Sequence, residues 1–230
     1  MHGQSETSNA PRVVWLLLDA VFLGLAAWLL LGGGAAFLPT WLAGRSPLLL
    51  EGPGARHFVL IAFGVVLFLR MFLAGFFLLK RRFGWEELGG VLLALFVYQV
   101  GFALMTLSAS PNLDALDYFS VVLFLVGSWL NTGSELQRKR FKDDPGNKGK
   151  LCTGGLFRYA RHINYFGDIL WVGAWALMTR NPWSAIVPIT LTAGFVFGFI
   201  PPLAKYLHER YGEDYEEWAR TTKKLVPFVY

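Results

Sequence analysis

The sequence is short of charged residues and of cysteine. Asp, Glu, Lys and Arg make up 16% of its 230 residues, whereas about 25% is usual in a soluble domain. The single cysteine, Cys152, excludes an internal disulfide and any metal cluster held by several thiolates. Instead, 54% of the residues are hydrophobic. They occur in long blocks, which is typical of a membrane protein.

The hydrophobic blocks predict membrane spans, because a helix needs about 20 apolar residues to cross a bilayer. The candidate spans lie at about 13–38, 57–79, 88–107, 118–133, 166–179 and 184–204. The fourth and fifth blocks are short, which leaves their ends open and gives about six to seven spans. We therefore expect an all-α, polytopic transmembrane helical bundle that forms a single integral membrane domain over residues 1–230.

Basic residues favour one face of this bundle. All but four of the 21 Lys and Arg residues lie in the N-terminal segment, the loop 80–82, the loop 134–165 or the tail 205–230. The exceptions are Arg45, Arg56 and Arg180 in the opposite loops and Arg70 inside the second span. Because Lys and Arg concentrate in cytoplasmic loops, we expect both termini and the polar stretch described below to be cytosolic. The membrane would be the endoplasmic reticulum in a eukaryote or the inner membrane in a bacterium. The orientation of the chain in the membrane also explains its net charge of +5, so we expect no nucleic-acid partner. We also expect no obligate protein partner.

Two charged residues lie inside the predicted spans. Asp19 and Arg70 both fall in the cytoplasmic half of antiparallel helices, where a charge costs at least about 2.5–3.5 kcal/mol. We expect them to be paired, directly or through a polar neighbour, and Tyr98 and Gln99 of the third span can join them. The group either fixes helix packing as a buried salt bridge or lines a cavity that reaches into the bilayer.

A dense run of polar residues precedes the fifth span, where residues 152–168 read CTGGLFRYARHINYFGD. Basic residues crowd the loop around it: Arg138, Lys139, Arg140, Lys142, Lys148, Lys150, Arg158 and Arg161. Such residues can draw a loop to anionic lipid headgroups. Next to the glycine backbone of Gly154-Gly155 they also suit a polyphosphate cofactor. If a helix begins here, Arg161, Tyr165 and Asp168 lie on one face of it.

Motifs of several soluble enzyme classes are missing. The chain has no Gly-x-Gly-x-x-Gly after a strand and no phosphate-binding loop, so a soluble dinucleotide fold is not expected. His208-Glu209 is not a zinc-protease motif, because Gly212 stands where the second histidine is needed. We expect no metal site, and a nucleotide would have to bind at helix ends and loops.

Four motifs in the second half resemble the steroid 5α-reductase superfamily, which includes bacterial relatives of unassigned function and the sterol reductases. They are LNTGSE at 130–135, GGLFRY at 154–159, RHINYFGD at 161–168 and KLVPFVY at 224–230. Residues 129–230 carry most of the resemblance, as a C-terminal cofactor-binding region. The chain departs from the family pattern with Ile163 in place of a common proline and with Glu135 in place of Asp.

The resemblance implies a membrane reductase that uses NADPH and transfers hydride to an activated carbon–carbon double bond of a lipid from the bilayer. The lipid would be a steroid or sterol, a polyprenol or an enoyl lipid. By motif, the implied cofactor contacts are Asn131, Glu135, Arg138, Arg161, His162, Asn164, Tyr165 and Asp168, with His208, Arg210 and Tyr211 from the tail. The family's catalytic pair is assigned here to Tyr98 as the acid, with Asp19, Arg70 or Gln99 as its orienting partner.

Two alternatives stay open. Membrane methyltransferases related to the isoprenylcysteine carboxyl methyltransferases share an RHPxYxG stretch and use S-adenosylmethionine. They commonly carry a Glu-Glu pair in the tail, where this chain reads Leu203-Ala204-Lys205. A membrane scaffold or lipid-binding protein with a degenerate site is the second alternative, and it predicts the loss of cofactor residues that are all present here.

Overall fold

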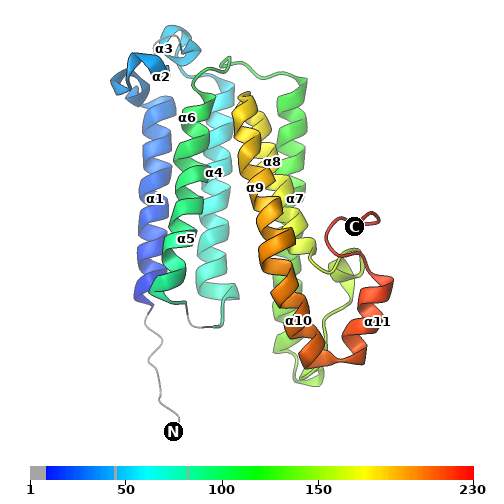
Figure 1. Ribbon diagram of the computed structural model, residues 1–230. Coiled ribbons are helices and arrows are strands. Elements are labelled where there is room, and N and C mark those ends of the chain that lie inside the picture. The colour runs from blue at the N-terminus through cyan, green and yellow to red at the C-terminus, as the bar shows by residue number, and fades with distance from the viewer. Residues whose placement is uncertain (1–8, 44–45, 82) are drawn as a thin grey trace. The chain divides into compact units, whose positions relative to one another are not determined.

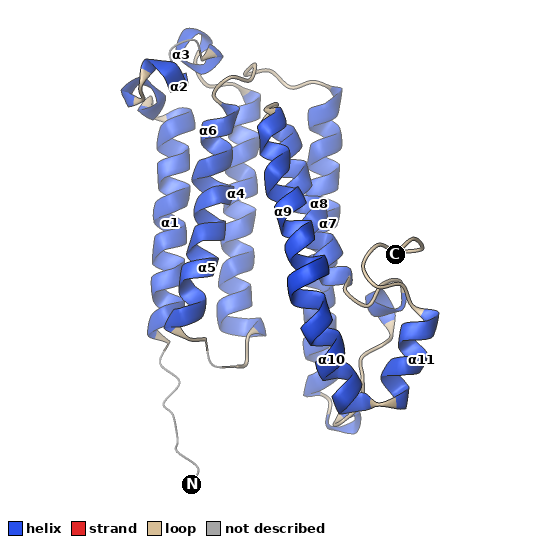
Figure 2. Cartoon of the chain, viewed as in Figure 1, coloured by secondary structure: helices blue, strands red, loops and turns tan. Residues whose placement is uncertain are grey.

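The computed structural model describes residues 9–43, 46–81 and 83–230, and the regular elements in these ranges are all helical (Figures 1 and 2). The predicted all-α class is therefore confirmed. Arg45 and Arg82, which entered the topology prediction, lie outside the described residues. The chain divides into two compact units, one made of residues up to Asp117 with Met178–Asn181, the other of Tyr118–Leu177 with Pro182–Tyr230. The single-domain organisation stays a prediction.

Three long apolar helical segments build the first unit. They are α1 (Ala10–Leu31), α4 (Ala55–Leu73) with its π-helical end η2 (Ala74–Leu78), and α5 (Trp85–Phe96) continued by the π-helical η3 (Val97–Gly101) and α6 (Phe102–Thr106). α1 packs against both α4 and α5. Large apolar side chains such as Leu17, Leu69 and Leu93 are exposed on these helices. A helix that is apolar all round suits lipid rather than water.

Short helices join these segments on the side where α1 ends. They are the 3₁₀ turn η1 (Gly34–Phe37), α2 (Thr40–Ala43) and α3 (Pro47–Glu51). The predicted first span ran to about residue 38, but α1 ends at Leu31. Gly32, Gly33 and Gly34 follow directly, and Gly33 has a φ of 78°, which stops helix propagation.

The second unit contains most of α7 (Ala115–Asp143) and α8 (Ile163–Met178), followed by a long interrupted helix and a short one (Figure 1). The interrupted helix consists of α9 (Ile186–Ala193), the π-helical η7 (Gly194–Phe199) and α10 (Ile200–Tyr211), and α11 (Glu213–Thr221) comes after it. The 3₁₀ turns η4 (Pro145–Asn147), η5 (Gly155–Arg158) and η6 (Pro182–Ala185) lie in the connections.

Five segments of the described chain are long and apolar enough to cross a membrane. They are Ala10–Leu31, Ala55–Leu78, Trp85–Thr106, Ala115–Asp143 and Pro182–Tyr211. The segment predicted at 166–179 corresponds to α8, which has 16 residues. At 1.5 Å per residue it is about 24 Å long, shorter than a hydrocarbon core of about 30 Å. Five full spans and one shorter apolar helix agree broadly with the predicted bundle.

The prediction that a loop begins at residue 134 is wrong, because α7 continues to Asp143. Residues 134–142 are rich in Glu, Leu, Gln, Arg and Lys, which favour helix. Two ion pairs along the helix add to this: Arg138 Nη1 lies 3.1 Å from Glu135 Oε1, and Lys139 Nζ lies 2.6 Å from Asp143 Oδ2. As a result, the predicted cofactor residues of α7 share one helical face.

A buried ion pair joins the start of α4 to the start of α7 within the first unit. Arg56 Nη1 and Nη2 donate to Asp117 Oδ1 and Oδ2 at 2.5 and 2.8 Å, and the two side chains are 2% and 0% exposed. Arg56 also donates to the carbonyl oxygens of Ser110, Asn112 and Met178 at 2.7, 2.8 and 3.1 Å. The guanidinium therefore gathers three stretches of chain around one carboxylate.

Removing the carboxylate of this pair should destabilise the fold. Asp117→Ala leaves the Arg56 charge buried without its counter-ion, which costs about 3–5 kcal/mol. The comparison variant is Asp114→Ala, because Asp114 is a 61% exposed carboxylate that caps the helix through Leu116 N–H and pairs with Arg180 near the surface. Its loss should cost about 1 kcal/mol. Unfolding in detergent measures both, and equal losses would show that the buried pair contributes little.

Candidate functional site

The site in the second unit begins where α7 and α8 approach each other closely. A Cβ added to Gly167 would lie 2.5 Å from Asn131 N and 2.7 Å from Gly127 O, and one added to Gly127 would lie 2.5 Å from Trp171 N. Only glycine at both positions permits this backbone contact, as in small-residue packing of membrane helices. The contact brings the polar side chains of the two helices together.

A chain of hydrogen bonds runs across this contact. Asn131 Nδ2 donates to Asn164 O at 3.3 Å, and Asn164 Nδ2 donates to Glu135 Oε1 at 2.9 Å. Glu135 in turn pairs with Arg138 at 3.1 Å, and the Arg138 guanidinium lies 4.7 Å from the centre of the Phe157 ring. The side chains predicted from separate motifs thus form one connected network.

Stacked rings extend this network along α8. The His162 ring stacks on Tyr165 with a centroid distance of 5.5 Å, and Tyr165 stacks on Phe195 at 4.4 Å. Asp168, further along α8, accepts from Trp171 Nε1 at 2.8 Å. These contacts fix the orientation of His162 and Tyr165, so that both are held rigidly without a ligand.

Gln137 shapes the glycine turn before η5. Its Nε2 donates to Gly154 O at 2.7 Å and its Oε1 accepts from Leu156 N at 3.0 Å. Gly155 has a φ of 59°, and a Cβ at this residue would overlap the Gln137 amide. The Gly154-Gly155 pair is therefore required by both backbone conformation and space.

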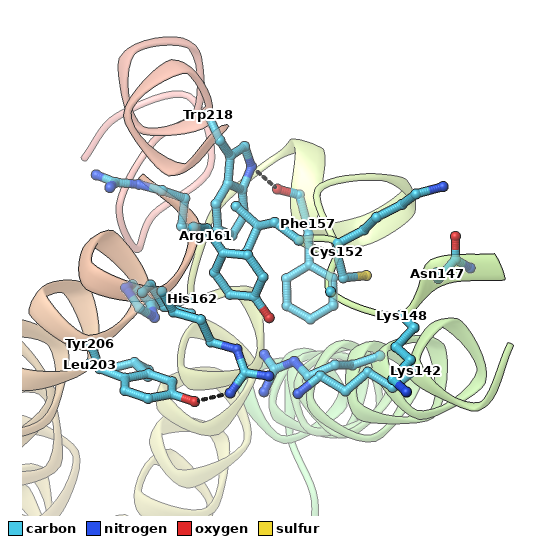
Figure 3. Close-up of a pocket in the computed structure, with 17 residues that line it drawn as sticks. Lys142, Asn147, Lys148, Cys152, Phe157, Arg161, His162, Leu203, Tyr206 and Trp218 are labelled. Carbon is cyan, nitrogen blue, oxygen red and sulfur yellow. Dashed lines mark hydrogen bonds between the residues drawn. The ribbon is translucent and has the colours of Figure 1, made fainter. Parts of the chain in front are cut away.

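A cavity of about 360 Å³ opens beside this network within the second unit (Figure 3). Among the described residues, its wall carries six basic side chains and no carboxylate: Arg138, Lys142, Lys148, Lys150, Arg161 and Arg210. Aromatic side chains complete the wall: Phe157, Tyr206, Tyr211 and Trp218. Two hydrogen bonds hold the rings, from Trp218 Nε1 to Phe157 O at 3.3 Å and from Arg210 Nη1 to Tyr206 OH at 2.6 Å (Figure 3). Glu135 pairs with Arg138 beside the wall, and the excess of positive charge that remains suits an anionic ligand.

Two buried polar atoms in this region have no hydrogen-bond partner among the described residues. They are Arg161 Nε and Asn164 Oδ1. The rest of Arg161 is held, since its Nη1 donates to Tyr215 OH at 3.1 Å and its main-chain N donates to Lys223 O at 2.8 Å. An unpaired buried donor and acceptor cost free energy, so their presence suggests that a ligand or water satisfies them.

The predicted cofactor residues fall into two groups that adjoin each other. Arg138, Arg161, His162, Arg210 and Tyr211 line the cavity, whereas the side chains of the α7–α8 contact are linked to its wall residues Arg138 and His162: Asn131, Glu135, Asn164 and Tyr165. Asp168 lies further along α8, where it accepts from Trp171. His208 lies apart from both groups at the corner of α10 and α11, with its Nδ1 3.5 Å from Glu216 Oε1. The role of each as a cofactor contact stays a prediction.

The cavity also contains residues that sequence reasoning did not single out as contacts. Leu203, Tyr206 and Leu207 lie on the same face of α10 as the predicted contact Arg210, and their spacing of three or four could have indicated a common surface. Trp218 of α11 gave no such signal. It reaches the wall because α11 folds back and buries Tyr215 and Trp218 against Phe157, Ala160 and Ile163.

Burial holds His162 in its neutral form. The side chain is 3% exposed. Burial and, after it, the positive charges of Arg161, Arg138 and Lys224 lower its pKa from 6.5 to about 4. At neutral pH the imidazole adds no charge to the cavity, whose positive potential comes from the Lys and Arg side chains alone.

The predicted catalytic residues lie in the first unit. Gln99 Nε2 donates to Asp19 Oδ1 at 3.1 Å and to Gly64 O at 3.2 Å, so Gln99 is a polar neighbour of Asp19, as expected. In the described chain, Asp19 Oδ2 and Gln99 Oε1 are buried without a hydrogen-bond partner. Tyr98 precedes Gln99 in the π-helical η3, and its ring stacks on Phe102 at 6.2 Å. Such π-helical turns often occur at functional sites.

Arg70 is the fourth member of the predicted catalytic group. It lies near the end of α4 and is buried. Its pairing with Asp19 stays a prediction, and so do the catalytic roles of all four residues.

Comparison with known proteins gives one family model and several similar enzymes. A family model described as "Protein of unknown function (DUF1295)" matches residues 90–222. The Delta(14)-sterol reductase of Schizosaccharomyces pombe is 31% identical over 125 residues, which cover 47% of this chain and 29% of that protein. The 3-oxo-5-alpha-steroid 4-dehydrogenase 1 of Homo sapiens is 36% identical over 109 residues, 47% of this chain and 40% of that protein.

A relative of another class also matches. A probable O-methyltransferase of Ustilaginoidea virens is 34% identical over 93 residues, which cover 39% of this chain and 32% of that protein. The chain thus spans less than half the length of each of these three relatives.

The close contact of α7 and α8 predicts a position-specific effect of alanine. Gly167→Ala forces the two backbones apart and should destabilise the protein by about 1–3 kcal/mol. Gly173→Ala is the control in the same helix, because a Cβ there meets nothing within 4 Å. It should be neutral or stabilising by up to about 1 kcal/mol, since alanine favours helix. Thermal unfolding in detergent gives both values, and a tolerated Gly167→Ala would contradict the contact.

The neutral state of His162 predicts a loss of stability in acid. Between pH 6.5 and about 4, the unfolded chain binds a proton that the folded chain excludes, so stability falls as pH falls through this window. The full effect is about 3 kcal/mol. Unfolding of the wild type and of His162→Gln should be followed from pH 7 down to 4. The wild type should lose stability relative to the variant, and parallel curves would contradict the assignment.

Proposed function

Because the chain belongs to the family described as "Protein of unknown function (DUF1295)", within the steroid 5α-reductase superfamily, we propose that it is a membrane-embedded, NADPH-dependent reductase. Its substrate would be an activated carbon–carbon double bond in a lipid that enters from the bilayer, such as a steroid or sterol, a polyprenol or an enoyl lipid. The cofactor side would be cytosolic, as the distribution of Lys and Arg favours.

The acid-free basic cavity of the second unit carries this proposal. NADPH has a pyrophosphate and a 2′-phosphate, and bidentate guanidinium groups with lysines recognise such oxygens. Arg138, Arg161 and Arg210 offer guanidinium groups, while Lys142 and Lys148 add point charges (Figure 3). The volume of about 360 Å³ is near the lower end of small-ligand pockets, so it fits the phosphate-bearing part of the cofactor.

The polar side chains beside the cavity suit the rest of such a cofactor. Within the described part of the chain, Asn164 Oδ1 is a buried acceptor without a partner and Arg161 Nε is a buried donor without one. Amide and ribose groups can satisfy both kinds of atom. The stacked His162 and Tyr165 rings are held in fixed orientations, so little conformational entropy is lost on binding.

Bound NADPH would supply hydride to the β-carbon of the activated double bond. On the protein side, a tyrosine hydroxyl that donates to the substrate carbonyl oxygen stabilises the negative charge that develops there. We propose Tyr98 for this role, with Asp19, Gln99 and Arg70 as its orienting partners in the first unit. The placement of Tyr98 in a π-helical turn next to the Asp19–Gln99 bond supports this choice.

Methyl transfer from S-adenosylmethionine is the second candidate, favoured by the match to a probable O-methyltransferase. S-adenosylmethionine carries a positive sulfonium and no phosphate. Six basic side chains without an acid in the cavity wall oppose such a ligand and favour an anionic one.

Thermal shift in detergent with NADPH, NADH and S-adenosylmethionine separates these functions. A ligand at 100 times its Kd stabilises the folded state by about 2.7 kcal/mol. We expect a clear shift with NADPH, a smaller one with NADH because it lacks the 2′-phosphate, and none with S-adenosylmethionine. A shift with S-adenosylmethionine alone would favour the methyltransferase, and no shift with any ligand would contradict both.

The same assay on Asn164→Ala locates the binding site. The variant loses the buried acceptor and its bond to Glu135, so the shift caused by NADPH should shrink or disappear. Asn181→Ala is the matched control, because Asn181 donates to Met105 O in the first unit. Its NADPH shift should equal that of the wild type, whatever its own melting temperature. An unchanged shift in Asn164→Ala would contradict the site.

A further inference from the structure

An exposed apolar patch lies on the loop 222–230, outside the long helices. Phe228 and Val229 are 79% and 73% exposed, and Tyr159 and Tyr230 are exposed beside them. Tyr159 and Phe228 touch edge to face with a centroid distance of 6.0 Å. In the described residues 144–162 and 212–230, these four are the exposed large apolar side chains. They gather in one place, whereas scattered single residues would need no explanation.

A cation accompanies each tyrosine of this patch. Arg158 Nη2 donates to Tyr159 OH at 2.7 Å, and its guanidinium lies 4.8 Å from the centre of that ring. Lys224 Nζ donates to Tyr230 OH at 3.0 Å and lies 4.7 Å from the centre of the Tyr230 ring. Lys223 is exposed nearby. Aromatic rings with basic groups at their polar ends are typical of the membrane–water interface.

The loop is held firmly to the start of α8. Arg161 N donates to Lys223 O at 2.8 Å, and His162 N donates to Lys224 O at 3.0 Å. Leu225 is buried with Phe195 and Ile200 in the hydrophobic cluster beside α8. Phe228 adopts a φ of 66°, and the N–H groups of Leu225 and Val226 both donate to Tyr230 O. The patch is thus a rigid tip next to the start of α8, and Figure 1 shows the C-terminus away from the end of α10.

We propose that this tip, formed by Tyr159, Phe228, Val229 and Tyr230, is an anchor that inserts into the interface of a bilayer containing anionic lipids. Four apolar residues are too few for a stable protein interface, which takes about 20–30 residues a side. A bilayer needs no such area, because the helices of the same unit already hold the loop at its surface. Arg158, Lys223 and Lys224 match the negative charge of the headgroups.

The loop that carries the anchor also bonds to the cavity wall. The two main-chain bonds from Arg161 and His162 end on the segment that carries the tip. Lipid contact would therefore limit the motion of two residues that line the cavity. The anchor itself does not depend on which ligand the cavity binds.

Spin labels measure the depth of the tip directly. The single cysteine makes this simple, because Cys152→Ser gives a cysteine-free background. Nitroxides are placed at Phe228→Cys and at Val229→Cys in the full chain, reconstituted in nanodiscs with and without phosphatidylglycerol. For each nitroxide, the accessibility to oxygen is divided by the accessibility to the polar nickel complex NiEDDA. This ratio rises with depth in the bilayer. Glu213→Cys on exposed α11 is the aqueous control, and Phe197→Cys on the apolar span is the lipid control.

The anchor predicts a ratio at 228 and 229 several-fold above that at 213 and close to that at 197. Phosphatidylglycerol should raise it further, and Arg158→Gln with Lys223→Gln should remove that rise. A ratio equal to that at 213 would overturn the proposal, since the tip would be in water. Low accessibility to both reagents would overturn it too, because a protein surface would then cover the tip.

Discussion

Polar groups that enter the hydrocarbon layer have no water to bond to, and this constraint organises the whole protein. Backbone groups are satisfied within helices, and helices are the only regular elements of the described chain. Side chains at depth find partners in one another, as Gln99 does with Asp19 and Gly64. Where many polar groups meet, as at Asn131 and Asn164, they bond to one another at the contact of two helices, and a ligand can satisfy what remains.

The close contact at Gly127 and Gly167 does for the second unit what the Arg56–Asp117 pair does for the first. Each brings distant parts of the sequence to a fixed distance, one by removing side-chain volume and the other by a buried charge pair. The glycine contact places the face of α7 that carries Asn131, Glu135 and Arg138 against the start of α8. From there the main-chain N–H groups of Arg161 and His162 donate to Lys223 O and Lys224 O, so that the C-terminal motif is held next to the start of α8.

Much of the fold and of the candidate site could be predicted from the sequence. Apolar blocks predicted the helical class and most span positions, and the polar stretch at 152–168 predicted the site region. The end of α7 was misplaced because charge was taken as a sign of a loop, whereas Glu135–Arg138 and Lys139–Asp143 pairs stabilise helix. The part of the cavity wall built by Tyr206 and Trp218 was missed, because their convergence depends on how α11 folds back, which is tertiary information.

Composition alone could not tell which buried polar residues serve packing and which serve function. Arg56 and Arg70 are both buried arginines near the ends of α4, yet all the groups around Arg56 fit a packing role, since its donors are used by one carboxylate and three carbonyls. Asp19 and Gln99 instead keep one buried oxygen each that has no partner among the residues that the structure describes. A buried polar interaction that leaves acceptors unpaired costs free energy and therefore stabilises helix packing little. This difference in hydrogen-bond satisfaction, rather than burial or charge, favours Asp19 and Gln99 as functional residues.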